Sequence, residues 1–404
     1  MNLSDVKLTP DVFHEAVPHE MFSVLRREAP VYFHPEEDGG AGFWVISKYE
    51  DLKSVSRQPL LFSSHRGGTN IRELQGEQLD RVRALMLNMD PPQHRKFRNI
   101  VNKAFTPRMV NALIPSVKRL AREIVDGVAE QGECDFVTEV ASIMPMAVIC
   151  EMMGVPAEDR PRINDLANKL IGFDDPEYQS SIADAEKAAL EMFMYGAKLQ
   201  EKARKHPGDD LGTALLHAEV DGERLTDFEF HSFFMLLAIA GNETTRTVTT
   251  NGMLALIENP DQRRRVVENP ALVESAVEEI LRYTPAVHHF RRTATADTEI
   301  RGQKIREGDK VTIWYTSANR DEDVFGDSQA FDVARDPNDH LAFGIGEHFC
   351  LGSNLARMEL NLIFDELLRR IGRDMELAAP PRRLRSNFVN GVKEMRVTFS
   401  PERA

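Results

Sequence analysis

The spacing of hydrophobic residues predicts a chain built mainly from helices. From about residue 90 to residue 375, apolar residues recur at intervals of three and four, the pattern of helices with one buried face, and prolines separate the segments. Short runs of β-branched and aromatic residues at 31–33, 43–46, 310–314 and 395–399 indicate small β-sheets. We therefore expect a mainly α fold with small β-sheets. No stretch rich in Gly, Ser or Pro divides the chain, so residues 1–404 are predicted to form a single large domain.

The longest predicted helix runs from Thr226 to about Glu258. Thr226 and Glu229 have the T-x-x-E spacing of a capping box, and Asn259-Pro260 supplies the stop. A helix of roughly 32 residues would be about 48 Å long, enough to cross the whole molecule. Residues 233–241 are apolar all round, so we expect this part of the helix to be buried on every side.

Two further helices are predicted near the C-terminus. One begins at Asn269-Pro270, an N-cap followed by proline, and ends before Pro285. The other starts directly after Cys350, and Gly372 occupies the position expected of a C-cap. Its apolar stripe contains Leu351, Leu355, Met358, Leu362 and Ile371.

Composition excludes several classes of function. The net charge of −14 argues against nucleic-acid binding, which requires a basic face. The longest apolar run, residues 233–240, is far shorter than the roughly 18 residues of a membrane-spanning helix. The N-terminus lacks the features of a signal peptide, so a cytoplasmic location is expected. Three cysteines with no C-x-x-C pair predict neither a disulfide framework nor a zinc site.

Polar residues interrupt the middle of the long helix. Glu243 and Thr244 follow Ala240 and Gly241, and further threonines follow them. A buried glutamate must be paired, hydrated or neutral. The hydroxyl and the acid could relay protons beside a flat cofactor, which the small residues would allow to approach the backbone. Alternatively, the threonines only bond back to the carbonyl groups four residues earlier and bend the helix.

Cys350 lies in a glycine-rich loop immediately before a predicted helix. The loop reads Phe-Gly-Ile-Gly-Glu-His-Phe-Cys-Leu-Gly over residues 343–352. A cysteine thiolate in such a loop is a suitable axial ligand for haem iron, and it favours O–O cleavage. The alternative is a cysteine that serves as a small buried hydrophobic residue.

The spacing of Phe343, Gly346, His348, Cys350 and Gly352 resembles the haem-binding signature of the cytochrome P-450 superfamily at every defined position. The resemblance extends over nearly the whole chain. It implies the cytochrome P-450 fold, with haem b held between the long central helix and the cysteine loop, and Cys350 as the ligand to iron. By the same resemblance, the cofactor would be bound by His94, Arg98, Ala240, Gly241, Arg292, Phe343, Gly344, His348, Cys350 and Gly352, with His94, Arg98, Arg292 and His348 at the propionates.

The resemblance also assigns roles to charged residues. Glu243 and Thr244 would deliver protons during oxygen activation. Glu279 and Arg282 match the E-x-x-R pattern of the family, and Arg335 would complete a structural network with them. Without the resemblance, Glu279 and Arg282 have the i, i+3 spacing of an ordinary surface ion pair, which contributes at most about 1 kcal/mol.

The resemblance implies a substrate site made mainly of apolar residues. The predicted substrate-binding residues are Leu237, Val287, His288, Phe290, Phe388 and Val389. The sequences of residues 240–246 and 383–391 resemble those of bacterial hydroxylases of sterols, methyl-branched lipids or terpenoids.

These features predict a monooxygenase that uses O2 and a hydrophobic small molecule. No G-x-G-x-x-G follows a strand, so the chain has no flavin or nicotinamide domain of its own. A ferredoxin and its NAD(P)H-dependent reductase are therefore the expected electron donors. Two alternatives are a non-oxygenating haem-thiolate enzyme (a peroxygenase or an isomerase) and a haem-based sensor or ligand-binding protein; neither would require the acid–alcohol pair.

Overall fold

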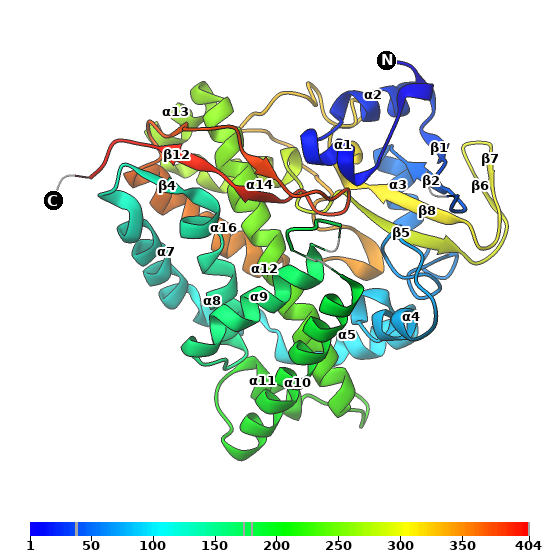
Figure 1. The fold of residues 1–404 in the computed structure, drawn as a ribbon, viewed down its shortest axis with the longest axis horizontal. Helices are drawn as coiled ribbons and strands as arrows, with labels where there is room; N and C mark the ends of the chain where they lie inside the picture. The colour runs from blue at the N-terminus through cyan, green and yellow to red at the C-terminus, as the bar shows by residue number, and fades with distance from the viewer. Residues whose placement is uncertain (37–38, 173, 179–180, 403–404) are drawn as a thin grey trace.

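The long helix α12 (Asp227–Glu258) runs through the middle of the molecule. In this computed structural model, residues 1–36, 39–172, 174–178 and 181–402 are described. The predicted capping box is present: Thr226 Oγ1 accepts the Glu229 N–H at 3.2 Å, and Glu229 Oε2 accepts the Thr226 N–H at 2.8 Å. Helices cluster on one side of α12 and the largest sheet lies on the other (Figure 1).

The fold is mainly α, as predicted. In chain order the other helices are α1 (Pro10–Glu15), α2 (His19–Glu28), α3 (Tyr49–Ser56), α4 (Gly76–Arg83), α5 (Gln93–Ala104), α6 (Pro107–Ala112), α7 (Ile114–Ala129), α8 (Ile143–Met152), α9 (Arg160–Ile171), α10 (Ile182–Lys205), α11 (Leu211–His217), α13 (Pro260–Glu268), α14 (Val273–Tyr283), α15 (Tyr315–Ala318) and α16 (Ser353–Arg370).

The main sheet has the strand order β1-β2-β8-β5-β3. Only β2 and β8 pair in parallel; the other neighbours are antiparallel. Smaller sheets are β4-β12-β9, β10-β11 and β6-β7. The strands are β1 (Val31–His34), β2 (Phe43–Ile46), β3 (Phe62–Ser63), β4 (Glu133–Asp135), β5 (His289–Ala294), β6 (Thr298–Ile300), β7 (Gln303–Ile305), β8 (Lys310–Trp314), β9 (Glu376–Leu377), β10 (Arg382–Arg383), β11 (Val392–Glu394) and β12 (Arg396–Thr398).

All four predicted strands are present, although the last is limited to Arg396–Thr398. Strand β5 was not predicted, because its sequence begins His-Phe-Arg-Arg and resembles an exposed polar segment. In the structure it lies between β8 and β3, and both of its arginines are buried. Pairing on both sides supplies hydrogen bonds that the local sequence does not reveal.

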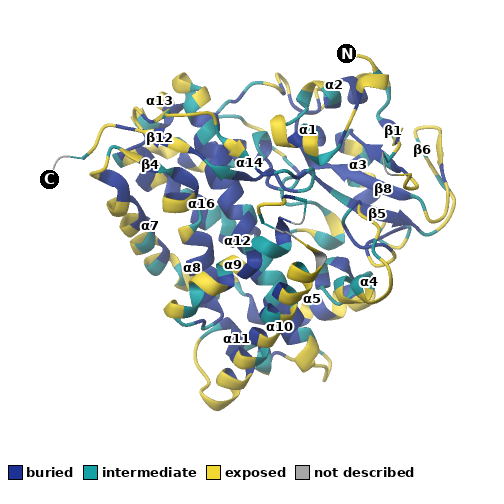
Figure 2. Ribbon diagram, in the orientation of Figure 1, coloured by how far each residue is buried: buried dark blue, intermediate teal, exposed yellow. Residues whose placement is uncertain are grey.

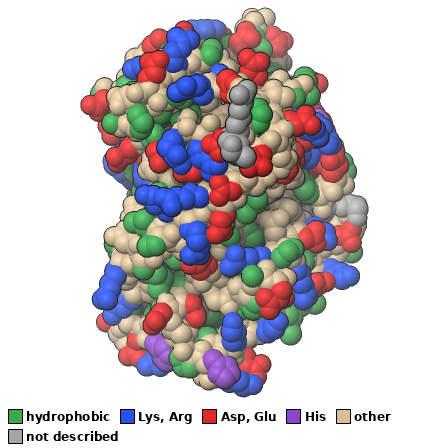
Figure 3. All heavy atoms as spheres, turned by 90° about the vertical axis from the view of Figure 1, so that its left-hand side faces the viewer, with side chains coloured by type: hydrophobic (Ala, Val, Ile, Leu, Met, Phe, Trp, Pro, Cys, Tyr) green, Lys and Arg blue, Asp and Glu red, His purple; other side chains and the backbone are tan. Residues whose placement is uncertain are grey.

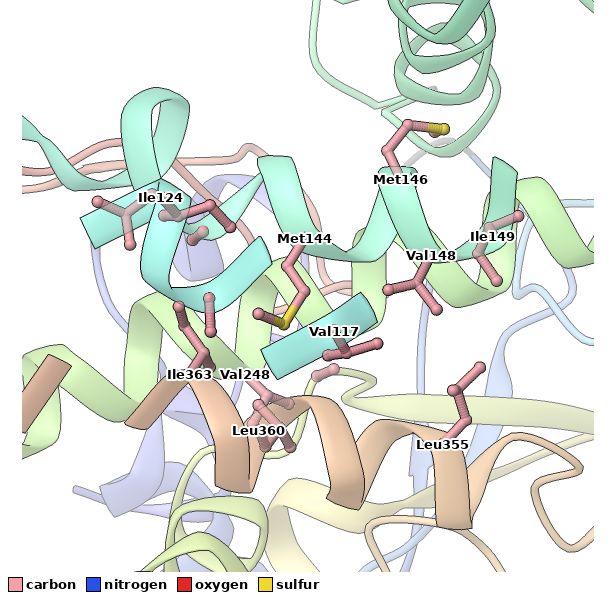
Figure 4. Close-up of a cluster of buried hydrophobic side chains, with 14 of the residues drawn as sticks. Val117, Ile124, Met144, Met146, Val148, Ile149, Val248, Leu355, Leu360 and Ile363 are labelled. Atoms are coloured by element: carbon pink, nitrogen blue, oxygen red, sulfur yellow. The ribbon is translucent and has the colours of Figure 1, made fainter. Parts of the chain in front are cut away.

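The main hydrophobic core forms where α7, α8, α12 and α16 meet (Figure 4). Val117, Ile149, Val248 and Leu360, one from each helix, are all buried there. Burying an aliphatic side chain of this size stabilises a fold by about 1.5–3 kcal/mol. These contacts fix α16, and with it the loop that precedes it, relative to α12.

The two other predicted helices begin and end close to the expected residues. The helix predicted from Pro270 starts as a 3-10 turn (Pro270–Leu272) and continues as α14. Gly372 follows α16, but its backbone does not adopt the left-handed conformation of a C-cap glycine. Glycine fits there because a Cβ would lie 2.9 Å from Leu368 Cδ2 and 3.1 Å from the Leu367 carbonyl oxygen.

The prediction that residues 233–241 are buried on every side is wrong. Phe233, Phe234 and Ala238 are buried, but Leu237 is only partly buried and Ala240 is exposed. Figure 2 shows the remainder of α12 mostly buried. The exposed stripe borders an internal cavity, so its exposure is to the cavity and not to the outer surface.

Charges of both signs are interspersed on the face that Figure 3 shows. Within the described residues, none of the helices has the length and apolarity needed to cross a membrane.

Candidate functional site

A large cavity separates the middle of α12 from the cysteine loop. Counted as all the space between atoms, including its open mouth, it measures about 1560 Å³. Leu237, Ala240 and Thr244 line it from α12, and Cys350 and Gly352 line it from the loop. The two sequence segments that carry the predicted chemistry therefore face each other across one space.

The cysteine loop is shaped by glycines in the left-handed conformation. Gly344 has φ +70° and Gly346 has φ +78°, and a Cβ on Gly346 would lie 2.8 Å from the carbonyl oxygen of Ser56. The Cys350 N–H donates to the Phe343 carbonyl at 2.9 Å, which closes the loop. Gly352 has a negative φ, and a Cβ there would meet no protein atom. Gly352 lies on the cavity wall, so the absence of a side chain leaves space in the cavity.

Cys350 differs from the other two cysteines in its surroundings. Burial raises the pKa of all three thiols, to about 12 for Cys134 and Cys150. At Cys350 this effect is opposed by the Gly352 backbone N–H and by the charges of Arg98 and Arg357. Of the three cysteines only Cys350 lines the cavity, so the interpretation as a small hydrophobic residue fits Cys134 and Cys150 and not Cys350.

On the opposite wall, Thr244 presents its side chain at the cavity. Its hydroxyl donates to the Ala240 carbonyl at 2.6 Å, and Thr249 and Thr250 make the same bond to residues four positions earlier. The hydrogen bonds of the alternative stated for the threonine run are therefore present, and Thr244 makes such a bond while it also lines the cavity. Gly241 also lines the cavity, and a Cβ there would lie 2.6 Å from Ile149 Cδ1, so packing against α8 also requires glycine.

Glu243 is buried but does not line the cavity. Its carboxylate forms an ion pair with Arg246 on the next turn of α12 and accepts the Thr247 hydroxyl at 3.3 Å. Arg246 in turn donates to Asn168 Oδ1 on α9 at 3.1 Å. Although burial alone would lower it, the charge of Glu243 raises the pKa of Arg246. The acid and the alcohol that were predicted to work together therefore differ in environment: Thr244 faces the cavity, and Glu243 is paired with Arg246 behind its wall.

The four predicted propionate-binding residues gather at one side of the cavity. His94, Arg98, Arg292 and His348 all line it, and the rings of His94 and His348 are 4.4 Å apart. His94 Nδ1 lies 3.3 Å from Glu347 Oε1, and His348 Nε2 lies 3.3 Å from Ser64 Oγ. Burial, together with the neighbouring charges of Arg292, His94 and Arg98, lowers the pKa of His348 to about 2.

The two arginines of this group lack an acidic partner among the described residues. Arg98 donates to the Phe349 carbonyl at 2.9 Å, and Arg292 donates to the Arg291 carbonyl at 2.8 Å. Neither forms an ion pair with a described carboxylate, and burial lowers the pKa of both. Arg292 is buried and Arg98 is half-buried, and two such cations without counter-charges create a favourable site for the carboxylates of a ligand.

The E-x-x-R pair is fully buried, so the surface-pair alternative is excluded. The side chains of Glu279 and Arg282 are 0% exposed and form two hydrogen bonds of 2.7 and 2.8 Å. Arg282 also donates to the carbonyls of Asn319, Ser328 and Ala330. Arg335 Nε lies 3.1 Å from Glu279 Oε2. The predicted contacts of Glu279, Arg282 and Arg335 are all present, and they connect α14 to the segment that leads to the cysteine loop.

Three of the predicted substrate residues line the cavity and three do not. Leu237, Val287 and Phe290 are on its wall. His288, Phe388 and Val389 lie behind it: His288 Nδ1 bonds to Thr316 Oγ1 at 2.7 Å, while Val389 bridges to Val287 and packs in a separate apolar cluster with Phe388. Because side chains alternate along a strand, β5 turns Phe290 and Arg292 to the cavity.

The sequence interpretation missed several residues of the wall. These are chiefly apolar side chains from distant segments, including Met86, Phe105, Ile149 and Tyr315, whose convergence no local pattern reveals. Glu359 is different. It follows Leu355 by four residues, so it lies in the predicted apolar stripe of α16. A carboxylate in an apolar stripe indicates a functional position and could have been recognised in the sequence. Burial raises its pKa to about 8.

The residues around the cavity fit a haem. A thiol lies on one wall, and small residues and an alcohol lie on the opposite wall. Two arginines without acidic partners lie at one side, where the Nδ1 of His348 has no partner among the described residues. Cys350 would hold the iron, and Arg98, Arg292, His94 and His348 would bind the propionates. No group of three or more described His, Cys, Asp or Glu side chains is arranged to hold a metal ion, so Cys350 would hold iron as part of a cofactor that brings the other ligands of the metal.

Comparison with known sequences gives matches over almost the whole chain. The family model described as Cytochrome P450 matches residues 14–399. A steroid C26-monooxygenase of Rhodococcus jostii is 41% identical over 96% of this chain and 83% of its own length. A methyl-branched lipid omega-hydroxylase of Mycobacterium tuberculosis is 42% identical, covering 94% and 90%. A linalool 8-monooxygenase of Pseudomonas putida is 37% identical over the full length of both chains.

Solved structures agree with the sequence matches. A cytochrome P450 of Mycobacterium marinum, determined in complex with pseudoionone, superimposes with a TM-score of 0.90 at 37% identity and covers 98% of both chains. The expected fold, and a haem as cofactor, are therefore confirmed at the level of the family. With the thiol, the buried cations and the long helix placed around one cavity, these matches show that the chain belongs to the cytochrome P450 family.

Proposed function

We propose that this chain is a haem-thiolate monooxygenase acting on a hydrophobic small molecule. One atom of O2 enters a C–H bond of the substrate, and the other leaves as water with two electrons and two protons. A sterol, a terpenoid or a methyl-branched lipid is the proposed substrate class, because relatives at 37–42% identity are named for such compounds. The 1–404 chain would act as a single domain in the cytoplasm.

One observation carries this proposal: Cys350 and Thr244 line the same cavity from opposite walls, and apolar side chains provide most of the wall between them. Bound haem b would supply the oxygen-activating chemistry, with Cys350 as its axial ligand. Leu237, Val287 and Phe290 would bind the apolar body of the substrate and exclude water from it. Thr244 would position protons at the cavity wall.

Electrons are proposed to come from a ferredoxin and its NAD(P)H-dependent reductase. The sequence contains no nucleotide-binding glycine motif that would supply them internally.

Turnover with a surrogate ferredoxin and reductase tests the proposal. NADH and 18O2 should give a hydroxylated product that contains one 18O atom, with candidate substrates chosen by their ability to shift the haem spectrum from low to high spin. A product without the label, or the absence of substrate-dependent NADH use across all three compound classes, would contradict it.

Peroxide-driven oxygenation is the second candidate. The observation in its favour is that Glu243 is paired with Arg246 behind the cavity wall, so the acid–alcohol pair is not assembled at the cavity. The source of the oxygen atom distinguishes the two functions. A peroxygenase would incorporate label from H2(18O)2 and remain inactive with NADH, ferredoxin and reductase. Neither label would enter the product of an isomerase, and a sensor would give no product.

A further inference from the structure

Beside the cysteine loop, Arg357 of α16 and Glu278 of α14 form an ion pair that the proposed function does not use. Arg357 Nε lies 2.7 Å from Glu278 Oε1, and its Nη2 lies 2.8 Å from Oε2. This two-point contact fixes the plane of the guanidinium, which a single contact would not do. The pair is partly buried, with side chains 33% and 27% exposed.

A third residue keeps Glu278 ionised. His340 Nε2 lies 3.0 Å from Glu278 Oε2. Although burial acts in the opposite direction, hydrogen bonds from Arg357 and His340 lower the pKa of Glu278 to about 2. The carboxylate therefore carries a full negative charge near neutral pH and offsets the charge of Arg357.

The pair also reaches the loop that carries Cys350. The Arg357 guanidinium lies over the ring of Phe343, 4.5 Å from its centroid, and the Phe343 carbonyl accepts the Cys350 N–H at 2.9 Å. Arg357 is one of two arginines whose charge acts on the Cys350 thiol, the other being Arg98. A contact whose only purpose was to join α14 to α16 would not need a cation stacked on the loop.

We propose that Arg357 and Glu278 are positioning residues that set the electron density on the Cys350 sulfur, and thereby the reduction potential of the haem iron that it binds. This inference rests on the proposed function, because it requires Cys350 to be the iron ligand. Arg357 stabilises negative charge at the thiolate, which weakens its donation to iron and favours the reduced state. Glu278 offsets part of the charge of Arg357 and so limits the strength of that effect.

The two residues should therefore shift the potential in opposite directions. Arg357→Gln removes the positive charge, so the ferric state gains stability and the midpoint potential falls. Glu278→Gln leaves the charge of Arg357 uncompensated, so the midpoint potential rises. In the double variant both charges are absent, and the potential should lie between those of the single variants.

Spectroelectrochemical titration of the purified holoenzyme measures these potentials without a redox partner, so any effect of Arg357 on docking does not enter. Arg369→Gln is the matched control, because Arg369 is on the same helix, pairs with Glu366 and is 59% exposed; its potential should equal that of the wild type. Arg357→Lys keeps the charge and should recover most of the shift caused by Arg357→Gln.

Shifts of the same sign in Arg357→Gln and Glu278→Gln, or shifts no larger than that of Arg369→Gln, would overturn the inference. If Arg357→Gln and Arg357→Lys lost haem equally, the pair would be a structural contact and the inference would also be wrong. The spectrum of the reduced CO complex of the wild type separates this result from failure of the proposed function: without thiolate ligation in the wild type, the function itself fails.

Discussion

Arg246 holds the Glu243 carboxylate in a buried ion pair on α12, one residue before the Thr244 hydroxyl that lines the cavity. The sequence motif suggests an acid and an alcohol that act as a unit. The structure places Glu243 and Thr244 on different faces of α12, because consecutive residues of a helix point about 100° apart. The contributions of Glu243 and Thr244 can therefore be measured separately.

Thr244→Ala should uncouple electron use from product formation. The variant retains the cavity and the cysteine loop, so NADH consumption should stay within about twofold of the wild type, while product per NADH falls several-fold and hydrogen peroxide appears. The ratio of product to NADH is the measurement. Thr249→Ala is the control, since Thr249 makes the same bond to a carbonyl four residues earlier but does not line the cavity. Tightly coupled turnover in Thr244→Ala would exclude a role for this hydroxyl.

Arg246→Met should destabilise the protein strongly. It leaves Glu243 buried without its cation, and removing one partner of a buried ion pair costs about 3–5 kcal/mol. The free energy of unfolding in urea is the measurement. Glu243→Gln/Arg246→Met, which removes both charges, should recover much of the loss. If the single and double variants are equally stable, the pair is not coupled as the structure indicates.

Glu359→Gln should make stability less dependent on pH. Burial raises the pKa of Glu359 to about 8, whereas an exposed glutamate titrates near 4.5. Between these values the folded protein holds a proton that the unfolded chain has released, so stability falls as pH rises from about 4.5 through 8. The wild type should therefore lose more thermal stability than Glu359→Gln between pH 6 and pH 8.5. Parallel pH profiles of the two proteins would contradict this assignment.

Arg282→Lys should disrupt the segment that leads to the cysteine loop. Lysine keeps the charge but cannot bond both oxygens of Glu279 and the carbonyls of Asn319, Ser328 and Ala330 together. We expect a loss of about 1–3 kcal/mol for each buried acceptor left without a donor, and reduced haem content. Haem per protein, measured by absorbance, checks this. Arg162→Lys, which alters an exposed ion pair with Glu191, is the control and should have normal haem content. Normal haem content in Arg282→Lys would show that haem binding does not need the Glu279–Arg282 network.

Local patterns were sufficient to predict the elements with strong signals in their own sequence. The capping box at Thr226, the strand at 43–46 and the loop around Cys350 are where the sequence indicates them. The capping residues and the loop glycines have specific backbone requirements, and the strand combines β-branched with aromatic residues. The resemblance to the family also named Cys350, Thr244 and the four predicted propionate-binding residues, and the structure places all of them on one cavity.

The remaining features depend on contacts between distant segments. Nothing near Glu243 in the sequence distinguishes a carboxylate facing the cavity from one paired with Arg246. His288 was grouped with Val287 and Phe290 by position, yet its hydrogen bond to Thr316 turns it away from the cavity. Strand β5 looks polar until both of its neighbours are known. Such outcomes are decided by tertiary packing and not by local preference.

The most direct test of the central claim is the absorption spectrum of the reduced CO complex of the purified protein and of its Cys350→Ser variant. If Cys350 is the sulfur ligand of haem iron, the wild type and the Cys134→Ala control should show the red-shifted Soret band of a thiolate-ligated haem, and Cys350→Ser should lack it. A red-shifted band that persists in Cys350→Ser, or wild-type protein that stays colourless after expression with ample iron and porphyrin precursor, would contradict the account.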